Sequence, residues 1–473
     1  MTSHAAPRPT GVASPPRFPR PVWVAHVAGF GMFVVVPLLL LDANRLEAFD
    51  LAIYDQSIWL LAHGLDFNTV AGIHVFGAHF SPVLYLLQPL AALPGGAVPE
   101  LVLEAWVLAL SVFPLHRLCV RLERQSNAFL VLFVVHPAIF TASWYGFHPW
   151  TLAAPFLILS VLALMSRPDW WVLSIFGIFG IALREDIGFW VVLLAAMLVI
   201  AGHLPWRQWL WGAIVPGFAS IAVVFWVMPA LSPVGDYLYG SSYLGQSTSV
   251  NITEFAASSL VRTAYLVLPL GMGLAALRRL RWPVAIPLLI PLVGLGLRDG
   301  NALATAFHYD LHLAIGVMLL VALSFSVEPS SARVLVGSLV AALAFGALRP
   351  TTPEIGPNPW GLVGNDRELV EVGDAIRALD DGQLSMSVPA QLVPHFSERA
   401  RIFIFPWPFD QVSPVPYPME CPWPDIVVAD RSVPSAPVWG EASTQYELFR
   451  FGERYSVYVY AGPAPVDASC GPA

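Results

Sequence analysis

The sequence predicts an α-helical protein that crosses a membrane many times and carries a small α/β domain at its C-terminal end. Of its 473 residues, 56% are hydrophobic and only 12% are charged, about half the charged share of an average soluble domain. Many apolar stretches reach the roughly 18 to 20 residues that a helix needs to cross a bilayer. They are continuous runs of Leu, Val, Ala and Ile, which favours spanning helices over the alternating strands of a membrane barrel.

Residues 1–20 are rich in Pro, Ser and Ala, and we expect them to form a disordered cytoplasmic tail. They lack the small-residue cleavage site of a signal peptide, so the first apolar stretch should remain as a membrane helix. Residues 21–348 then form the membrane domain, with about eleven predicted helices. These helices span residues 22–41, 98–118, 126–143, 151–166, 171–183, 187–202, 209–230, 260–277, 283–297, 311–326 and 332–348.

The orientation in the membrane follows from arginine, because the sequence contains no lysine. Cytoplasmic loops carry an excess of basic residues, and most arginine clusters fall in the inner loops if the N-terminus is cytoplasmic. Arg184 and Arg298 break this trend, and each stands beside acids. An odd number of helices then places the C-terminal domain outside. All-arginine usage beside abundant Ala, Pro and Gly is typical of a high-GC bacterium, so we expect a bacterial plasma-membrane protein. The net charge of -8 gives no indication of a nucleic-acid partner.

Nearly every polar cluster in the chain then falls in an outer loop. These clusters are "FDLAIYDQ", "GAHFSPVLY", "WYGFHPW", "LREDIGF", "SPVGDYLYGSSYLGQ" and "LRDGNALATAFHYD". Ionisable groups at the edge of a membrane are costly and tend to mark function. Their concentration on one side predicts a polar cavity at the outer surface.

Asp50 and Asp55 stand just beyond the first helix, in the predicted first outer loop, residues 42–97. One interpretation is that Asp50 caps a short interfacial helix and that Asp55 is solvated in its early turns. The other is that one of them acts as a general base and takes a proton from an acceptor hydroxyl. Five residues turn a helix by about 140°, so two helical acids at this spacing would not share a face.

Histidines accompany the acids. His79 follows in the same loop and could bind a phosphate, orient Asp50 or ligate a metal, or serve a purely structural role. His148 lies in "WYGFHPW", which is first of all an aromatic membrane belt, and its structural and functional interpretations are equally open. Glu100 and Glu104, at the start of the second helix, are most simply residues that stabilise the helix dipole.

Arg184, Glu185 and Asp186 interrupt an apolar stretch. A guanidinium flanked by acids can hold a phosphate, since its planar fork matches phosphate oxygens; the alternative is a self-neutralised loop between two helices. Arg298 and Asp299 repeat the pattern before "FHYDLH". In that stretch His308 and His312 are four residues apart, a spacing that can bind a metal, and Asp310 between them joins the substrate-binding candidates.

The composition changes at about residue 349, which predicts an extracytoplasmic α/β domain over residues 349–473. "NDRELVEVGDAIRALDDG" predicts an amphipathic helix that ends at Gly382. "LSMSV", "RIFIF" and "DIVVAD" predict short buried strands, and "QLVPHFSER" a helix between the first two. "YELFRFGERYSVYVY" predicts a hairpin with Gly452 in its turn. Outside the membrane a disulfide between Cys421 and Cys470 is chemically permitted, whereas Cys119 is expected to be a buried apolar residue.

Six segments carry a resemblance to a known family. "FDLAIYDQSIWLLAHG", "HFSPVLYLLQPL", "FHPWTLAAPFLIL", "ALREDIGF", "FHYDLH" and "VPAQLVPHFSERARIFIFP" occur in this order. Together they resemble a bacterial family of predicted multi-pass membrane proteins, known as domain of unknown function 2079, from about residue 45 to about residue 430. That family is grouped with the GT-C glycosyltransferases, which are polytopic enzymes that use sugars carried on a polyprenyl phosphate.

The resemblance implies roles for several residues. Asp50 matches the catalytic base of such enzymes, with Asp55 in a supporting position. Arg184 and Arg298 would hold the phosphate of a polyprenyl-phosphate sugar donor. The acceptor would be an envelope glycan, lipid or protein, and many of these enzymes also carry a soluble outer domain at the C-terminus. Here Asp50 is followed by Leu51, where many relatives have a second acid, so a divalent cation, Mg²⁺ or Mn²⁺, stays open as a cofactor.

Two other function classes stay open. A transporter or flippase of a lipid-linked or envelope precursor should place charges near the bilayer midplane, often on broken helices, whereas the charges here lie mostly at one face. A non-catalytic scaffold would bind a cell-wall partner through its outer α/β domain. The scaffold predicts that Asp50 can be replaced without loss of function.

Overall fold

The fold was analysed in a computed structural model of the chain. Most of the expected N-terminal tail, together with Asp299, His308, Cys421 and Cys470, lies outside the residues that the structure describes. The described residues are 18–46, 48–144, 146–232, 235, 252–271, 278–298, 310–324, 330–348, 366–380, 382–409, 419–420, 423–433, 443–462 and 471–472.

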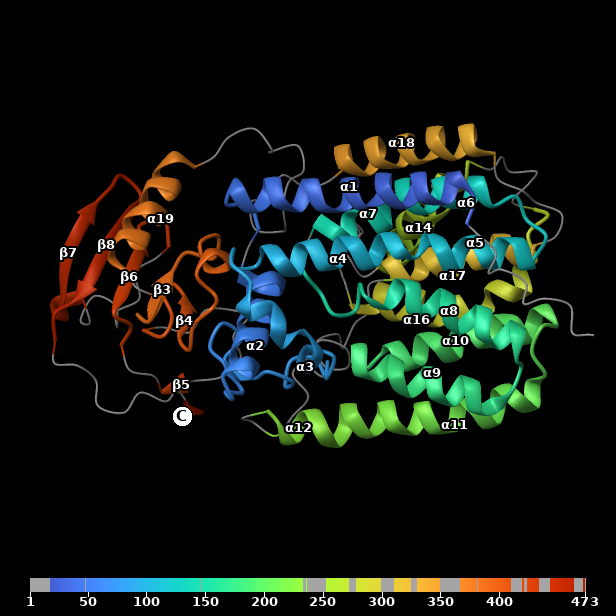
Figure 1. The fold of residues 1–473 in the computed structure, drawn as a ribbon, viewed down its shortest axis with the longest axis horizontal. Coiled ribbons are helices and arrows are strands. Elements are labelled where there is room, and N and C mark those ends of the chain that lie inside the picture. Colours follow the sequence, from blue (N-terminus) through green and yellow to red (C-terminus); the bar gives the residue numbers. More distant parts are fainter. Residues whose placement is uncertain are drawn as a thin grey trace, which may run out of the picture.

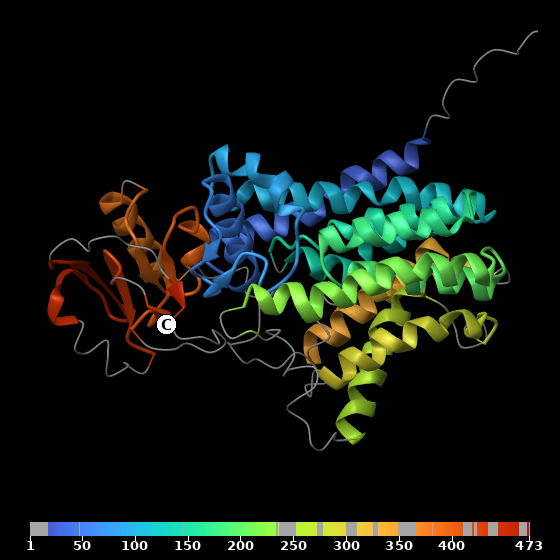
Figure 2. The same cartoon turned by 90° about the horizontal axis from the view of Figure 1, so that it is seen from below.

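A helix bundle and a sheet lie end to end along the long axis of the molecule (Figures 1 and 2). We call the end of the bundle that faces the sheet the sheet end, and the other the far end. The bundle and its loops contain α1 (Arg20–Asp42), η1 (Ala48–Ala52), α2 (Ile53–Ala62), β1 (Phe67–Asn68), β2 (Ile73–His74), α3 (Leu84–Leu87), η2 (Gln88–Ala92), α4 (Val98–Leu110), α5 (Val112–Arg121), α6 (Ser126–Val135), α7 (Pro137–Trp144), α8 (Ala153–Ser166), α9 (Trp170–Leu183), α10 (Ile187–Ala201), α11 (Trp206–Ala222), η3 (Val223–Val227), α12 (Met228–Ala230), α14 (Ile252–Val267), η4 (Leu268–Leu270), η5 (Trp282–Ala285), α16 (Ile286–Arg298), α17 (Leu311–Leu323) and α18 (Ser331–Leu348).

Four helical stretches of the described chain are long and apolar enough to cross a membrane. They are Arg20–Asp42, Val98–Arg121, Ser126–Trp144 and Trp206–Ala230, and the remaining apolar helices have 10 to 17 residues. The third stretch is divided where α6 gives way to α7 at Pro137, because proline has no N–H to continue the hydrogen-bond ladder. The structure is therefore mostly helical with candidate membrane spans, and the number of eleven crossings stays a prediction.

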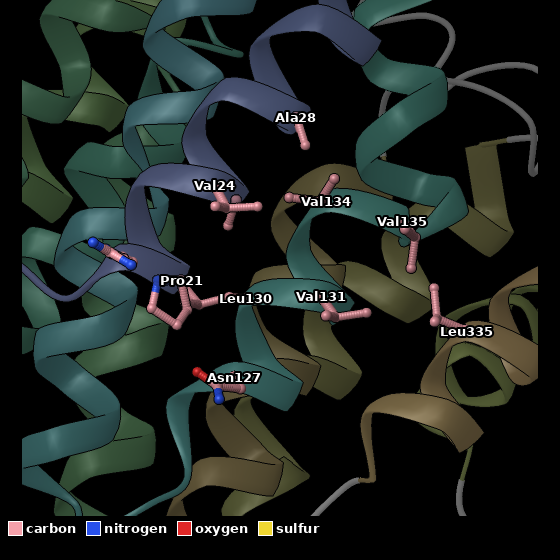
Figure 3. Close-up of a pocket in the computed structure, with 11 residues that line it drawn as sticks. Pro21, Val24, Ala28, Asn127, Leu130, Val131, Val134, Val135 and Leu335 are labelled. Atoms are coloured by element: carbon pink, nitrogen blue, oxygen red, sulfur yellow. The ribbon is translucent and has the colours of Figure 1, made fainter.

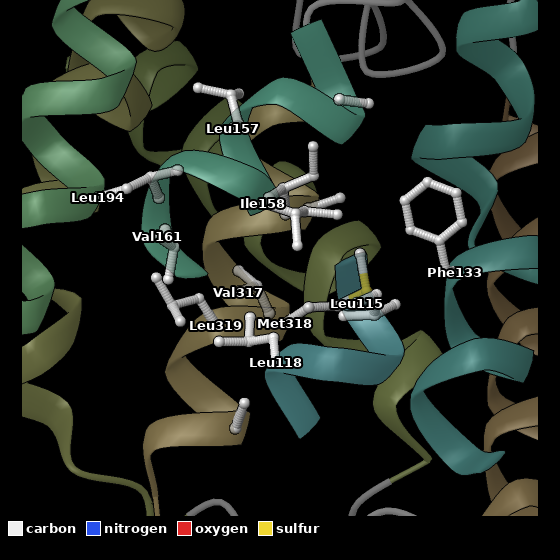
Figure 4. Close-up of a cluster of buried hydrophobic side chains, with 14 of the residues drawn as sticks. Leu115, Leu118, Phe133, Leu157, Ile158, Val161, Leu194, Val317, Met318 and Leu319 are labelled. Carbon is white, nitrogen blue, oxygen red and sulfur yellow. The ribbon is translucent and has the colours of Figure 1, made fainter. Parts of the chain in front are cut away.

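Apolar side chains fill the interior of the bundle. Leu115 and Leu118 from α5 meet Ile158 and Val161 from α8, with Leu194 of α10 and residues of α17 beside them (Figure 4). Nearly all of α17 is buried on every side, as expected of a central helix in a large bundle. The free Cys119 is fully buried in this core, which confirms its expected apolar role.

The C-terminal part forms a five-stranded sheet of order β4-β3-β6-β8-β7. Strand β3 pairs in parallel with both β4 and β6, while β8 pairs antiparallel with β6 and β7. The three strands expected to be buried, β3, β4 and β6, are buried along their whole length, and β7 and β8 form the expected hairpin. The elements are α19 (Arg367–Leu379), β3 (Met386–Val388), η9 (Val393–His395), β4 (Ile402–Ile404), β5 (Met419–Glu420), β6 (Ile426–Asp430), η10 (Ser443–Gln445), β7 (Tyr446–Phe451), β8 (Tyr455–Tyr460) and β9 (Gly471–Pro472).

Two helix predictions in this part need correction. The amphipathic helix α19 begins after Asp366, whose side chain accepts from the Leu369 N–H at 3.2 Å, but it ends at Leu379 rather than Gly382. The helix expected for "QLVPHFSER" is wrong, since that segment contains only the 3₁₀ turn Val393–His395. Pro394 in the middle of so short a segment lacks the N–H that an α-helix requires.

The sheet and the loop that follows α1 share one hydrophobic core. Ala48, Ala52 and Val70 of the loop pack with Met386 and Ile402 of the sheet. In Figure 1, α2 accordingly lies between strands β3 and β4 and the rest of the bundle. The sheet is thus packed against the bundle rather than suspended from it.

Candidate functional site

The candidate site is built around Asp50, in the short π-helical turn η1 that links α1 to α2. The side chain of Asp50 is 34% exposed, and its backbone has a φ of 80°. Non-glycine residues rarely adopt this left-handed conformation, although aspartate tolerates it better than most. Such strain persists where the surrounding structure imposes it, and it concentrates at functional sites. The expected capping role is wrong, because the residue before α2 is Ala52 and not Asp50.

Asp50 faces His148, which belongs to the loop between α7 and α8. The Nε2 atom of His148 lies 3.1 Å from Asp50 Oδ1, and its Nδ1 atom lies 2.9 Å from the Gly146 carbonyl oxygen. A carbonyl oxygen can only accept, so Nδ1 carries a proton. The two residues form a histidine–carboxylate pair in which His148 is only 2% exposed.

Gly146 fits this loop against η1. Its φ is 94°, and a Cβ atom there would lie 2.7 Å from the Cβ of Leu51. Both the left-handed conformation and the close contact require glycine. Gly146 therefore fixes the distance between the loop that carries His148 and the turn that carries Asp50.

Glu104 lies beneath this pair and was not recognised as a site residue from the sequence. It is 1% exposed, and its Oε1 atom lies 2.5 Å from the Thr151 hydroxyl, which also lies 2.6 Å from the His148 carbonyl oxygen. The Thr151 hydroxyl thus links Glu104 to the backbone of the loop that holds His148. Its expected role as a dipole-stabilising residue is wrong, since it braces the loop that holds His148.

A second polar cluster lies between α9 and α10. Arg184 Nε lies 2.8 Å from Asp186 Oδ1 and 3.8 Å from Glu185 Oε1. Glu185 also accepts from His79 Nδ1 at 2.8 Å and from the Phe80 N–H at 3.0 Å. Burial raises the pKa of Glu185, but the charge and hydrogen bond of His79, followed by the charge of Arg184, outweigh burial and leave this pKa below its usual range. The structure thus shows charges that largely neutralise one another.

Trp150 connects the two clusters. Its ring is 1% exposed and lies 5.8 Å from the ring of His148. The Arg184 guanidinium of the second cluster lies over the same ring, 5.6 Å from the Trp150 ring centroid, a cation–π distance. His312 approaches Trp150 as well, with ring centroids 4.9 Å apart and Nε2 at 3.3 Å from the Trp150 carbonyl oxygen. Segments far apart in the sequence therefore meet at one tryptophan.

Of the remaining candidates between residues 298 and 310, the structure describes the side chain of Asp310 only. Arg298 is the last residue of α16, and its side chain lies outside the described residues, as do Asp299 and His308. Asp310 is paired with Arg262 of α14, which the sequence did not single out, at 2.9 Å, and each is 1% exposed. A buried arginine within a predicted helix is the signal that could have identified Arg262.

Asp55 does not share the site with Asp50. It is 2% exposed and accepts a short hydrogen bond from Ser397 of the C-terminal part. Burial and the nearby charge of Glu100 hold the pKa of Asp55 well above its usual range. The expectation of a solvated Asp55 is therefore wrong, and this residue joins α2 to the sheet.

The family was identified by comparison with known proteins. Residues 43–458 match the model of a family described as predicted membrane protein, domain of unknown function 2079. The match covers most of the chain, so the chain belongs to this family. No curated protein matches the chain.

Proposed function

From membership of this predicted membrane protein family and from the geometry around Asp50, we propose that the protein is a membrane glycosyltransferase. It transfers a sugar from a polyprenyl phosphate to a hydroxyl group of an envelope glycan, lipid or protein. The reaction takes place at the sheet end of the bundle, which is the extracytoplasmic face of a bacterial plasma membrane. The N-terminus is then cytoplasmic.

The half-exposed Asp50 carboxylate carries this proposal. It is held by the buried His148 at 3.1 Å, in a left-handed backbone conformation. A partly exposed carboxylate beside a fixed imidazole ring can receive a proton from a bound hydroxyl. The contact with His148 orients Asp50 before the acceptor arrives.

In the proposed reaction the acceptor oxygen attacks the anomeric carbon from the side opposite the lipid phosphate. The O–H proton passes to Asp50, a C–O bond forms, and the bond to the phosphate oxygen breaks, with its electron pair leaving on the polyprenyl phosphate. The anomeric centre is inverted. No covalent intermediate with the protein is needed.

Arg184 is the donor-phosphate ligand in this proposal. Its guanidinium is held over Trp150 and is bonded to the partly exposed Asp186. The phosphate would replace Asp186 as the partner of Arg184, because both are oxyanions that fit the same planar fork. Charge that builds on the leaving phosphate would then be stabilised by a group already in position. Arg298 and Asp299 are proposed to extend this phosphate site.

A divalent cation does not fit the acids that the structure places here. Among the described residues, no three His, Cys, Asp or Glu side chains come together as metal ligands. Asp50 and Asp186 instead contact the side chains of His148 and Arg184. The proposed reaction therefore contains no step through a metal.

Mass spectrometry of envelope glycans and polyprenyl-linked sugars tests this function. A deletion strain should lose one glycoform, which wild type restores and Asp50→Asn does not, with the loss at least about 100-fold as expected for removal of a general base. Asp66→Asn is the matched control, since Asp66 is an exposed acid in the same loop, paired with His74 at 3.6 Å. A fully active Asp50→Asn enzyme would refute the base assignment.

The buried ion pair Arg262–Asp310 favours a second candidate, a transporter or flippase of a lipid-linked precursor. Charged pairs inside helix bundles commonly mark a substrate path. This candidate predicts that Asp310→Asn stops movement of the precursor across the membrane, while Asp50→Asn leaves it unchanged. Accumulation of the precursor on the inner leaflet of the deletion strain would support it over the transferase.

A further inference from the structure

We propose that a groove at the far end of the bundle binds one anionic phospholipid, with an acyl chain between α1 and α6 and the phosphate at Arg20. The groove has a volume of about 490 Å³, within the range of small-molecule sites in proteins. It lies at the opposite end of the bundle from Asp50, so this proposal does not depend on the proposed function.

Apolar side chains form both walls of the groove. Val24, Ala25 and Ala28 of α1 face Leu130, Val131 and Val134 of α6, with Val135 and Leu335 beside them. On α1, Ala28 follows Val24 and Ala25 by four and three residues, and on α6 Val134 follows Leu130 and Val131 in the same way, so each set forms one continuous stripe. Figure 3 shows Pro21 and Asn127 near one end of the groove, and Ala28 and Val134 toward the other. Val24 is 66% exposed, so the groove is open along its length to surrounding lipid.

The polar groups of the groove are confined to one end. Arg20 and Asn127 are the two residues in the lining with polar side chains, and they stand in the first turns of α1 and α6. Leu335, in the lining too, is the fifth residue of α18 and lies beside Val135 (Figure 3). The positive ends of the α1 and α6 dipoles therefore lie at the Arg20 end of the groove.

The first turns of α1 and α6 contain no acidic side chain, and no ion pair joins Arg20 to a described carboxylate. A guanidinium with helix N–H groups nearby is suited to a phosphate. An apolar channel that ends in such a group matches a lipid with a hydrocarbon chain and an anionic head.

The test uses the full-length protein, stripped of lipid in detergent and analysed by native mass spectrometry. Phosphatidylglycerol and phosphatidylcholine with identical acyl chains are the probes. Wild type should bind one phosphatidylglycerol about five- to tenfold more tightly than phosphatidylcholine, as expected for one basic side chain beside a head group with a net negative charge rather than a zwitterionic one. Arg20→Gln should remove this preference, and Arg20→Lys should keep part of it. Arg207→Gln is the matched control, because Arg207 is an exposed arginine in the first turn of another helix, α11.

A second pair of variants tests the acyl-chain groove. Ala28→Phe fills the groove and should weaken binding of both lipids at least about fivefold, whereas Val27→Phe, on the same helix but outside the lining, should leave both unchanged. Equal binding of the two lipids by wild type, or an unchanged preference in Arg20→Gln, would overturn the proposal. Tighter binding of a polyprenyl phosphate than of phosphatidylglycerol would assign the groove to a different lipid. If Ala28→Phe does not fold, the exposed Arg20 variants decide alone.

Discussion

At the scale of single residues, Asp50 combines the proposed role of general base with an unusual backbone conformation. Its position soon after the first helix could be recognised in the sequence, but its left-handed conformation and its partner could not. Both depend on Gly146 and His148, about 100 residues away, which fit against η1 only in the folded bundle. For the same reason Glu104 was missed, since nothing in its helical spacing predicts a contact with Thr151.

The backbone conformation of Asp50 makes the choice of substitution important. Asparagine tolerates a positive φ, whereas a residue with an ordinary Cβ and no polar side chain costs roughly 1–2 kcal/mol there. We expect Asp50→Ala to unfold about 1–2 °C below Asp50→Asn in detergent. Thermal unfolding followed by circular dichroism measures the difference.

The same pair of substitutions at Asp66 serves as the control. Asp66 is not among the residues with a positive φ. The Asp66→Ala and Asp66→Asn variants should therefore unfold at nearly the same temperature. An Asp50→Ala protein as stable as Asp50→Asn would contradict the strain that we ascribe to this position.

At the scale of elements, Thr69 completes the edge of the sheet. Its hydroxyl donates to the Ile402 carbonyl oxygen at 2.8 Å and accepts from the Ile402 N–H at 2.9 Å. It also accepts from Gln56 of α2 at 2.8 Å. Strand β4 lies at the edge of the sheet, where its backbone groups would otherwise lack partners. One loop side chain thus takes the place of a neighbouring strand.

Removal of this hydroxyl should weaken the whole junction. Thr69→Val leaves the buried N–H and C=O groups of Ile402 unsatisfied, which costs about 1–3 kcal/mol. Thr69→Ser keeps the hydroxyl and should be close to wild type. Limited proteolysis between the bundle and the sheet, together with the unfolding temperature, checks this difference. Equal protease resistance of the valine and serine variants would show that the contact does not hold the sheet.

Elements were predicted from the sequence where the pattern was local. The strands "LSMSV", "RIFIF" and "DIVVAD" are short apolar runs between turn residues, and each is a strand in the structure. The segment around Pro394 failed as a helix because one proline outweighed its apolar spacing. Thr69 and Ile402 are 333 residues apart in the sequence. No local pattern in either segment could have predicted that the two are in contact.

At the scale of the whole molecule, the contact between bundle and sheet contains a partly buried histidine. His395 of η9 lies against the end of α1, where Leu41 and Asp42 are its neighbours. It lines a cavity of about 610 Å³ between α1, α4 and α19. Burial, followed by the charge of Arg377, lowers the pKa of His395 to about 4.

This lowered pKa predicts acid sensitivity of the junction. An unfolded histidine titrates near pH 6.5, so between about pH 6.5 and pH 4 the unfolded chain binds a proton that the folded chain does not. The contribution of His395 to stability is therefore complete above about pH 6.5 and is lost as the pH falls toward 4, by roughly 1–3 kcal/mol.

Thermal unfolding at a series of pH values measures this loss. His395→Gln cannot titrate, so its unfolding temperature should fall less than that of wild type over the same interval. The unfolding temperature of His63→Gln, at the exposed position that directly follows α2, should fall as that of wild type does. Parallel curves for wild type and His395→Gln would place the acid sensitivity elsewhere.

The shared core of the loop and the sheet also affects how the protein is made. A ribosome that adds 5 to 20 residues per second needs roughly 20 s to 1 min to travel from Thr69 to Ile402. During that time the turn that carries Asp50 has been synthesised but lacks the partner segment against which it packs. A chain cut short before Ile402 would keep the helices of the bundle and lose the segment against which the turn that carries Asp50 packs. Quality-control proteases would therefore encounter a protein that has its bundle but lacks its C-terminal sheet. Synthesis of the last quarter of the chain then determines whether the protein escapes degradation.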